Sequence, residues 1–488
     1  MSATQLITWI VYLVAAVCFV MGLHLMRSPG TARRGNLLSA AGMGAAVLIT
    51  VVLLLDSRSG VGWHGGVFAG IALVGGLAVG GGYGWYSAKT VKMTAMPQLV
   101  SVFNAVGGGA AAFVALTDFL HRMSLAGDIS GAFGVDALLP VEFSVPVVLD
   151  IVIGSVTFTG SWIAAGKLQG IVSGNPITFA GSRIVMGASA LLAVVAGVWT
   201  IAVGGNTWLL LACLVGALTF GVLLVLPIGG ADMPVVISLL NAFTGLAVAM
   251  AGFVVDNEIL IVAGALVGAS GSILTKQMAD AMNRSILSIM VGGFGQGDTS
   301  AAAAAVAASG ASLRTVDADD VAIQLAYASK VMFVPGYGLA AGQAQHEIAE
   351  LGDLLSAHGV TVYYAVHPVA GRMPGHMNVL LAEASVPYDE MKEMEEANPE
   401  FDTADVALVV GANDVTNPAA RRAGTPISGM PILDVDHAKS VVVIKRGMGQ
   451  GYAGIDNELY TDPKTGMFFS DAKKGLASLI GAVKEYLD

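Results

Sequence analysis

The sequence predicts a polytopic α-helical membrane domain of nine spans, followed by an α/β domain with a Rossmann-like parallel sheet. Composition is the first reason: 55% of the 488 residues are hydrophobic and 12% are charged, whereas about 25% charged is usual in soluble domains. Charge placement is the second, since residues 1–290 hold 10 of the 35 acidic residues and the remaining chain holds 25. The third is a glycine-rich turn that directly follows an apolar strand ending near residue 335. We therefore expect a membrane domain at 1–290, a flexible linker at 291–321 and a Rossmann-like domain at 322–488.

Nine apolar stretches are each long enough to cross a bilayer, which takes about 20 helical residues. They lie at residues 7–26, 36–55, 61–82, 97–116, 145–165, 184–203, 207–226, 234–255 and 259–276. Basic residues in the intervening loops gather on one side, which predicts the cytoplasmic face; only Arg58 and Arg122 fall on the other. This places the N-terminus outside and the C-terminal domain in the cytoplasm, in a multi-pass protein of the cell (inner) membrane.

Polar residues inside the spans are costly in lipid and tend to face a bundle interior or water. Asn104 and Asn241 lie near the middle of the fourth and eighth spans, and Asp232 begins the eighth. Taken singly, each is explained by hydrogen bonds between helices, whereas together they suggest a hydrated polar path. Asp150, near the start of the fifth span, is placed where it could simply reach the membrane interface.

Several classes of site are excluded. The acidic balance of the chain, −11 at pH 7, argues against nucleic acid as a partner, because phosphates require a basic face. Cys18 and Cys213 lie far apart in apolar runs, so no disulfide framework and no metal site is expected. Residues 291–321 are rich in Gly, Ser and Ala without apolar periodicity, which is typical of a flexible linker.

The C-terminal domain alternates apolar strand-like runs with helical patterns. The strands are predicted at 331–334, 360–366, 406–410 and 440–444. Uninterrupted β-branched runs of this kind favour a parallel sheet that is covered by helices on both faces.

A nucleotide-binding turn is predicted after the first of these strands. Gly336, Gly338 and Ala341 form a G-x-G-x-x-A pattern between that strand and a helix predicted to continue to about residue 357. The first glycine allows a tight turn, and the second lets the backbone approach a pyrophosphate. The pyrophosphate charge would then face the N-terminus of the helix.

The second strand ends at His367-Pro368 without the acidic residue that typically holds the ribose 2′-hydroxyl of NAD. The strand at 440–444 instead ends in Lys445-Arg446, which could clamp a 2′-phosphate. A solvated basic pair explains this spacing equally well. Loops at 367–375 and 411–414 also leave strand ends, the edge where ligands bind in open α/β sheets.

Four loop sequences in this order after nine spans carry a family resemblance: 336–340, 367–384, 411–414 and 445–454, with 230–235 and 282–285 in the membrane part. With them, the chain resembles the beta subunit of proton-translocating NAD(P) transhydrogenases over essentially its whole length. The long 367–384 sequence is the most specific part of the match.

The resemblance implies that NADP(H) lies across the strand ends in a flipped orientation. Lys445 and Arg446 would hold the 2′-phosphate, Tyr452 would belong to a loop that folds over the nucleotide, and Asp414 would sit near the nicotinamide. The full implied set is Gly336, Tyr337, Gly338, Leu339, Ala340, Ala341, Val369, Ala370, Gly371, Arg372, Met373, Gly411, Ala412, Asn413, Asp414, Lys445, Arg446, Gly451, Tyr452, Ala453, Asp471 and Ala472.

The resemblance also implies a role in proton coupling for Asp232, Asn241 and Arg284. Asn104 joins this set, because it occupies the position of a histidine that carries protons in some members of the family. The titrating group would then lie on a partner subunit. A second departure is Gly447, which replaces a serine that often contacts the 2′-phosphate in the family.

The implied function is hydride transfer between NADH, bound on a partner alpha subunit, and NADP⁺ bound here, coupled to inward proton translocation. The partner would bring additional membrane helices, and a dimer of the alpha–beta unit is expected. Hydride would pass directly between nicotinamides, so no catalytic acid, base or nucleophile is expected. The alternative is a membrane transporter or channel that is gated by an NADP(H)-sensing cytoplasmic domain.

Overall fold

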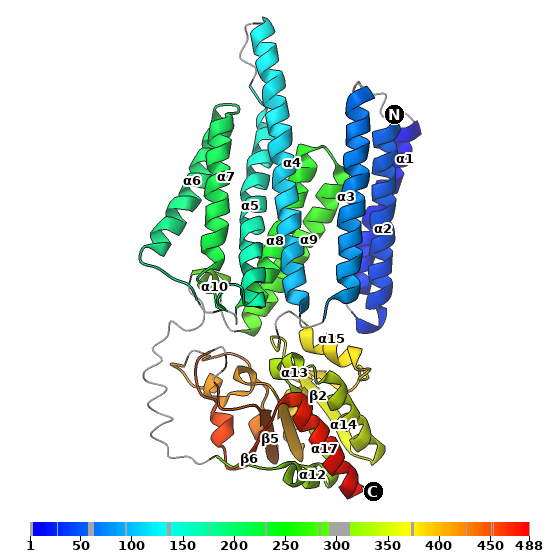
Figure 1. The fold of residues 1–488 in the computed structure, drawn as a ribbon, viewed down its shortest axis with the longest axis vertical. Helices are drawn as coiled ribbons and strands as arrows, with labels where there is room; N and C mark the ends of the chain where they lie inside the picture. The colour runs from blue at the N-terminus through cyan, green and yellow to red at the C-terminus, as the bar shows by residue number, and fades with distance from the viewer. Residues whose placement is uncertain are drawn as a thin grey trace. The chain divides into compact units, whose positions relative to one another are not determined.

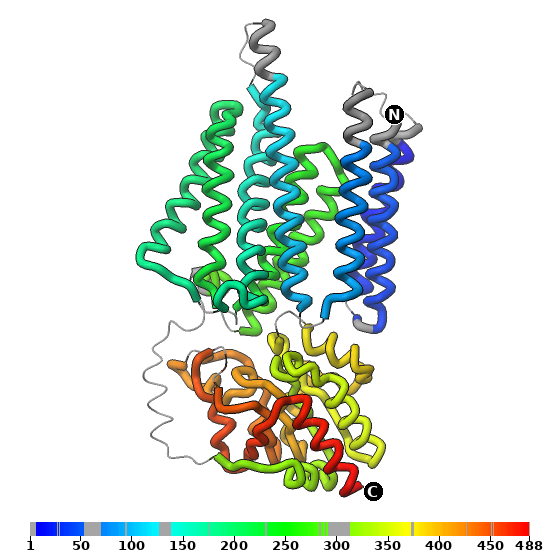
Figure 2. Tube along the Cα trace, in the orientation of Figure 1, coloured from blue at the N-terminus to red at the C-terminus, as the bar shows by residue number. Residues whose placement is uncertain are grey.

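The computed structural model describes residues 3–26, 28–56, 63–92, 95–133, 138–174, 176–229, 232–282, 285–291, 313–371, 375–425, 427–449, 451 and 453–487; the remaining residues are grey in Figure 2. Two compact units are formed. One comprises Met1–Gly166, Phe179–Leu224 and Leu239–Ser272, and the other comprises Lys167–Thr178, Val225–Ser238 and Ile273–Asp488.

The described part of residues 1–291 contains nine long helices and a short one, α10 (Ile286–Val291) (Figure 1). The long helices are α1 (Ala3–Leu25), α2 (Pro29–Asp56), α3 (Trp63–Thr90), α4 (Met96–Phe133), α5 (Val141–Gln169), α6 (Ser182–Ala202), α7 (Thr207–Val225), α8 (Met233–Val254) and α9 (Glu258–Ala281). Eight of them are long and apolar enough to cross a membrane. The ninth predicted span, 61–82, falls on α3, whose first part is not fully described and which is not among these eight. A helical membrane part is therefore confirmed.

Helix α4 continues well past the predicted end of its span at residue 116. Arg122, which we expected in a loop between spans, lies inside the helix. Arg122 forms a salt bridge of 3.0 Å with Asp118 one turn earlier, an i,i+4 pairing that favours a helix in water. Hydropathy predicts the part of a helix that lies in lipid, and it does not detect a polar extension of the same helix.

Glycines allow α8 and α9 to pack backbone against backbone. A Cβ added at Gly245 would lie 2.4 Å from the nitrogen of Gly268, and one at Gly264 would lie 2.4 Å from the nitrogen of Ala249. Close approach of this kind is how helices associate in lipid, where burial of apolar side chains gives no driving force.

The α/β fold is built on a six-stranded sheet in the order β3-β2-β1-β4-β5-β6, with every neighbouring pair parallel. This is the strand order of a doubly wound nucleotide-binding fold, so the predicted α/β domain is confirmed. The strands are β1 (Lys330–Pro335), β2 (Thr361–Val366), β3 (Met391–Glu393), β4 (Val406–Val410), β5 (Ser440–Lys445) and β6 (Thr465–Phe469). We did not predict β3 and β6.

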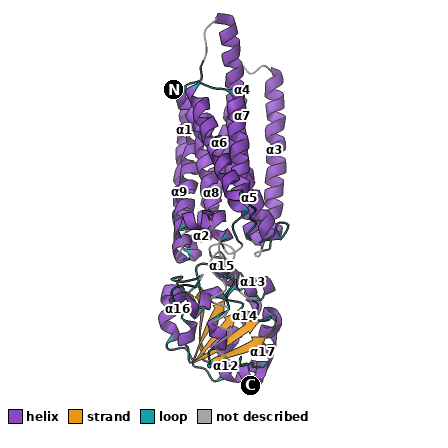
Figure 3. Ribbon diagram, turned by 90° about the vertical axis from the view of Figure 1, so that its left-hand side faces the viewer, coloured by secondary structure: helices purple, strands orange, loops and turns teal. Residues whose placement is uncertain are grey.

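Helices cover this sheet (Figure 3). They are α12 (Ala318–Ala326), α13 (Tyr337–Gly342), α14 (Gln345–Ala357), α15 (His376–Glu383), α16 (Met394–Phe401) and α17 (Ala472–Leu487). Helix α17 packs against α12, α13 and α14, whereas α16 packs against β2 and β3. Short 3-10 turns complete the loops at Asp414–Thr416, Pro418–Arg421, Val435–His437 and Glu458–Thr461.

Two details differ from the sequence expectation. The helix predicted to run unbroken to residue 357 is divided, because Gln343 adopts a left-handed conformation (φ 52°) that ends α13. The described fold also begins before residue 322: Thr315 bridges Met467, and Asp317 caps α12 through a reciprocal capping box with Asp320. The rest of the predicted linker, 292–312, lies outside the described residues, and the linker stays a prediction.

Candidate functional site

A cavity of about 640 Å³ opens at the carboxyl ends of the parallel strands. Its walls come from the segments that follow β1, β2, β4, β5 and β6. Strands β1 and β4 are neighbours in the sheet although β2 and β3 lie between them in sequence. The cavity therefore occupies the point where the strand order reverses, which is where ligands bind in this class of fold.

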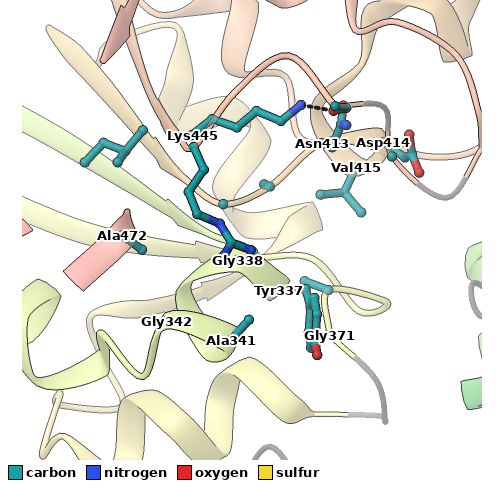
Figure 4. A pocket seen from close by; sticks show the side chains of 18 of the residues that line it. Tyr337, Gly338, Ala341, Gly342, Gly371, Asn413, Asp414, Val415, Lys445 and Ala472 are labelled. Carbon is teal, nitrogen blue, oxygen red and sulfur yellow. Dashed lines mark hydrogen bonds between the residues drawn. The ribbon is translucent and has the colours of Figure 1, made fainter. Parts of the chain in front are cut away.

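Most of the predicted nucleotide residues line this cavity: Gly336, Tyr337, Gly338, Ala341, Val369, Ala370, Gly371, Gly411, Ala412, Asn413, Asp414, Lys445, Arg446, Gly451, Asp471 and Ala472. Figure 4 shows Lys445, Asn413 and Asp414 along one side, and Tyr337, Gly338 and Ala341 along the other. Leu339, Ala340 and Ala453 are not in the lining, and all three are buried. Arg372, Met373 and Tyr452 lie outside the described residues. Nucleotide binding by these residues remains a prediction.

Glycines let the loops after β1 and β4 touch through their backbones. The N–H of Gly338 donates to the carbonyl of Gly411 at 2.8 Å, and Gly411 has φ +68°. A Cβ at Gly336 would lie 2.4 Å from the backbone of Ala412, and one at Gly411 would lie 2.4 Å from Cα of Gly338. The glycine pattern therefore joins the two loops, and both of them line the cavity.

Asp414 fixes the segment that follows β5. Its Oδ2 accepts a hydrogen bond from the N–H of Ala453 at 3.0 Å. A Cβ at Gly451 would lie 2.3 Å from Oδ1 of Asp414. A residue that we expected near the nicotinamide thus also holds Gly451 and Ala453 close to the cavity.

Lys445 ends β5 and is half-buried at the cavity. Its Nζ donates to the carbonyl of Gly449 and lies 4.7 Å from the ring centroid of Tyr460. Burial lowers the pKa of Lys445, and the carboxylates of Asp414 and Asp456 partly offset this effect. The exposed Arg446 follows it. Two adjacent cations at one strand end make this edge of the cavity suited to a phosphate.

His367 shapes the loop after β2 as a neutral side chain. Its Nε2 lies 2.9 Å from the carbonyl oxygen of Pro431, and its Nδ1 accepts from the N–H of Val369 at 3.2 Å. Only the tautomer with a proton on Nε2 satisfies both bonds. Burial lowers the pKa of His367 to about 4, although the bond to Pro431 opposes this effect. Val369 and Ala370 are thereby held at the cavity.

Residues that the sequence did not single out complete the site. Asn457 donates to the carbonyl of Asn413 at 2.9 Å, and the hydroxyl of Tyr460 donates to the carbonyl of Ala412 at 3.2 Å. Val415, Met430 and Ser470 join the lining. Ser470 follows the unpredicted strand β6, so placing it required the sheet itself.

A dinucleotide with an extra phosphate fits this donor set. Gly336, Gly338 and Gly411 bring two loops together at the cavity without side chains. The volume is typical of small-molecule sites, and Lys445 and Arg446 supply positive charge at one edge. Asp414 and Asp471 are also in the lining and disfavour an anion beside them. An anion is therefore favoured only at the β5 edge, where Lys445 and Arg446 lie.

The predicted proton-coupling residues lie in the helical part. Asn104 is buried in α4, and its carbonyl accepts from the hydroxyl of Thr244 on α8 at 3.3 Å. Asp232 is fully buried at the start of α8, whereas Asn241 is half-buried. Arg284 lies outside the described residues. A link between α4 and α8 at the level of Asn104 is thus present, and a role in proton coupling stays a prediction.

Known proteins resemble this chain over nearly its full length. The family model described as NAD(P) transhydrogenase beta subunit matches residues 8–482. Two curated relatives, both called NAD(P) transhydrogenase subunit beta and both from Rhodospirillum rubrum, are each 47% identical over 481 residues. The alignments cover 98% of this chain and 100% of each relative.

Proposed function

Because the chain belongs to the NAD(P) transhydrogenase beta subunit family, we propose that it binds NADP(H) in the strand-end cavity and exchanges hydride with NAD(H) held on a partner alpha subunit. We further propose that this exchange is coupled to inward proton translocation through the helices. The alpha subunit would contribute additional membrane helices, and the working assembly would be a dimer of the alpha–beta unit.

The observation that carries the choice of NADP(H) is the pair Lys445-Arg446 in the cavity lining at the end of β5. A 2′-phosphate distinguishes NADP from NAD, and two adjacent cations are the donors that favour it. The strand that would carry an acid in an NAD site, β2, ends at Val366 and is followed by the neutral His367. Gly447 leaves this edge without the hydroxyl that a serine would supply.

The bound nicotinamide supplies the hydride chemistry, so the residues of this chain act by placement. Gly336, Gly338 and Gly411 let the two loops meet where the pyrophosphate would lie, and Asp414 holds Gly451 and Ala453 near the site. Direct transfer between two nicotinamides requires no acid, base or nucleophile from the chain. Exclusion of water by the residues that close over the site would prevent loss of the hydride.

Proton coupling supplies the energy for an uphill ratio of nucleotides. One charge that crosses a potential of about 200 mV yields roughly 4.6 kcal/mol, which is about three decades in an equilibrium ratio. Asn104, Asp232, Asn241 and Arg284 are the proposed coupling residues. We place the N-terminus outside and the α/β domain in the cytoplasm of a cell whose inner membrane carries the protein.

The test is hydride transfer from NADPH to an NAD⁺ analogue in sealed membrane vesicles, with and without the alpha subunit, while the internal pH is followed. The proposal expects transfer that requires the alpha subunit and changes the internal pH. NADPH binding without transfer under either condition would contradict it and would favour a transporter or channel gated by an NADP(H)-sensing domain.

A further inference from the structure

We propose that Asp150 on α5 is a proton-binding carboxyl of the helical unit, loaded and unloaded once in each translocation cycle. This inference rests on the proposed proton coupling and names a titrating group on this chain. Its basis is a fully buried carboxylate that lies on a polar face shared by three helices.

Asp150 is 0% exposed. Neither of its two carboxylate oxygens has a hydrogen-bond partner among the described residues. It lies nine residues into α5, about 13 Å along the helix axis from Val141, and its carboxyl is enclosed by protein rather than exposed at a membrane interface. A lone ionised carboxylate in such surroundings is strongly disfavoured. The resting form that the geometry supports is therefore the neutral acid.

The face of α5 that carries Asp150 is polar over three turns. Thr157 and Ser161 follow at i+7 and i+11, spacings that return to the same side of a helix, and both are fully buried. Ser161 Oγ, like the Asp150 carboxylate, has no hydrogen-bond partner among the described residues. A Cβ at Gly108 of α4 would lie 2.8 Å from Cβ of Thr157, so this face packs on α4.

Helix α8 forms the third wall. Ile153, one turn from Asp150, packs with Ala111 of α4 and Ala247 of α8. Further along α4, a Cβ at Gly107 would lie 2.9 Å from Thr244 of α8, and the hydroxyl of Thr244 donates to the carbonyl of Asn104. Gly108 of α4 lies opposite Thr157 of α5, and Asn104 lies about one turn further along α4. Small residues and hydroxyls thus connect the level of Asp150 with that of Asn104.

No described cation neutralises Asp150. The titratable residues of α4 closest to this level are Asp118, His121 and Arg122. Arg122 already pairs with Asp118, and its guanidinium lies 4.0 Å from the ring centroid of Phe143. Phe143 precedes Asp150 by two turns, about 10 Å along α5. Helix α7 adds only Cys213, α6 only Arg183 at its far end, and α8 has no ionisable side chain.

The proposed step is a simple proton transfer. A proton from one aqueous side forms an O–H bond with the Asp150 carboxylate, and the same bond breaks when the proton leaves toward Asn104 and the other side. No electrons are exchanged. Water between the hydroxyls of Thr157, Ser161 and Thr244 would relay the proton, because the carboxyl and Ser161 are about 16 Å apart along the helix. This assigns to Asp150 the titrating role that Asn104 cannot perform.

The experiment uses the complete alpha–beta complex in sealed vesicles and compares Asp150→Asn, Asp150→Glu and the control Glu142→Gln. Glu142 is an exposed carboxylate in the first turn of the same helix. We expect Asp150→Asn to abolish the pH change that accompanies hydride transfer, Asp150→Glu to retain part of it, and Glu142→Gln to match the unaltered complex. Assembly and NADPH binding, measured on each variant, report whether it is folded.

Difference infrared spectroscopy gives a readout that a purely structural role would not change. A C=O stretching band of a protonated carboxylic acid should appear in the unaltered complex, vanish in Asp150→Asn and shift in Asp150→Glu. The inference is overturned if Asp150→Asn keeps full proton translocation, or if the carboxylic acid band persists in that variant. If the unaltered complex transfers hydride without any pH change, the proposed coupling fails, and Asp150 loses its role with it.

Discussion

The carboxylate of Asp414 lies directly against the backbone of Gly451: a Cβ at residue 451 would fall 2.3 Å from Oδ1. Oδ2 accepts from the N–H of Ala453 at 3.0 Å on the same segment. One acidic side chain after β4 therefore positions the segment after β5. The contact links a loop that we expect near the nicotinamide with a loop that we expect to fold over the nucleotide.

Gly451→Ala should weaken NADPH binding by about tenfold or more, because the new methyl group displaces Gly451 and Ala453 from Asp414. Overpacking of this kind typically costs about 1–3 kcal/mol. Isothermal titration calorimetry on the purified chain would measure the loss. Gly481→Ala on α17 is the control, since it lies outside the cavity lining and nothing lies within 4 Å of a Cβ there, and it should leave the dissociation constant unchanged. Equal losses would contradict the proposed contact.

Arg446→Ala should weaken NADPH binding roughly 10- to 100-fold, because a hydrogen bond to a charged group contributes about 1.5–3 kcal/mol. Residual NADH binding should change little, since NADH lacks the 2′-phosphate. Competition titrations with both nucleotides would measure the two effects. Arg422→Ala, at an exposed arginine paired with Glu458, serves as the control. Equal losses of NADPH and NADH binding would remove Arg446 from the 2′-phosphate role.

The strands at the centre of the sheet were predictable because each is an uninterrupted apolar run. Strands β3 and β6 were not. Only three residues form β3, and Lys392 and Glu393 are two of them. The last two residues of β6, Phe468 and Phe469, are apolar but its first two are Thr465 and Gly466. Pairing with β5 places β6 in the sheet, which no local pattern could indicate.

The loops of the site were predictable from glycine and charge spacing, whereas their supports were not. Asn457 holds the carbonyl of Asn413 from 44 residues away, and nothing near it in sequence marks it as part of the site. Met430 also lines the cavity, and no pattern near it in the sequence indicates this position. Likewise, the break at Gln343 arises because a non-glycine residue adopts a left-handed conformation, for which sequence has no strong signal.

The neutral state of His367 should make stability of the α/β domain depend on pH. Because the pKa of His367 is lowered from 6.5 to about 4 by burial, the unfolded chain binds the proton more tightly than the folded one. The unfolding free energy should therefore be constant above pH 6.5 and fall as pH drops toward 4, by about 3 kcal/mol in total.

Urea unfolding of the purified chain in detergent, with limited proteolysis as the readout, would measure the dependence of the unfolding free energy on pH. His367→Gln keeps a donor for the carbonyl of Pro431 and cannot become charged, so the contribution to the slope should disappear. His358→Gln, at an exposed histidine, should leave the slope as it was. Persistence of the full slope in His367→Gln would assign it to other groups.

Gly264→Ala should destabilise the helical unit by about 1–3 kcal/mol, the usual range for overpacking. A Cβ there would lie 2.4 Å from the backbone nitrogen of Ala249, which cannot move without moving α8. The gain in helix propensity, at most about 1 kcal/mol, does not offset this clash. Gly187→Ala is the control, because its Cβ would meet nothing within 4 Å. Thermal unfolding in detergent, read by circular dichroism, should separate the two variants, and similar melting temperatures would argue against the tight α8–α9 contact.

Lys445 should make NADPH binding weaken at alkaline pH. Burial lowers the pKa of Lys445 below its ordinary 10.5, so the ammonium loses its charge earlier than an exposed lysine as pH rises. A phosphate monoester is already doubly charged above about pH 6, which leaves Lys445 as the group that changes. Affinity should thus be constant below the lowered pKa of Lys445 and fall above it by up to about tenfold per pH unit. Lys445→Arg should abolish the decline, since a guanidinium stays charged. The control is Lys439→Arg, at a lysine before β5 that pairs with Asp405 at 2.8 Å; this variant should show the same decline as the unaltered chain. An unchanged decline in Lys445→Arg would show that a different group titrates and would weaken the assignment of the 2′-phosphate to the end of β5.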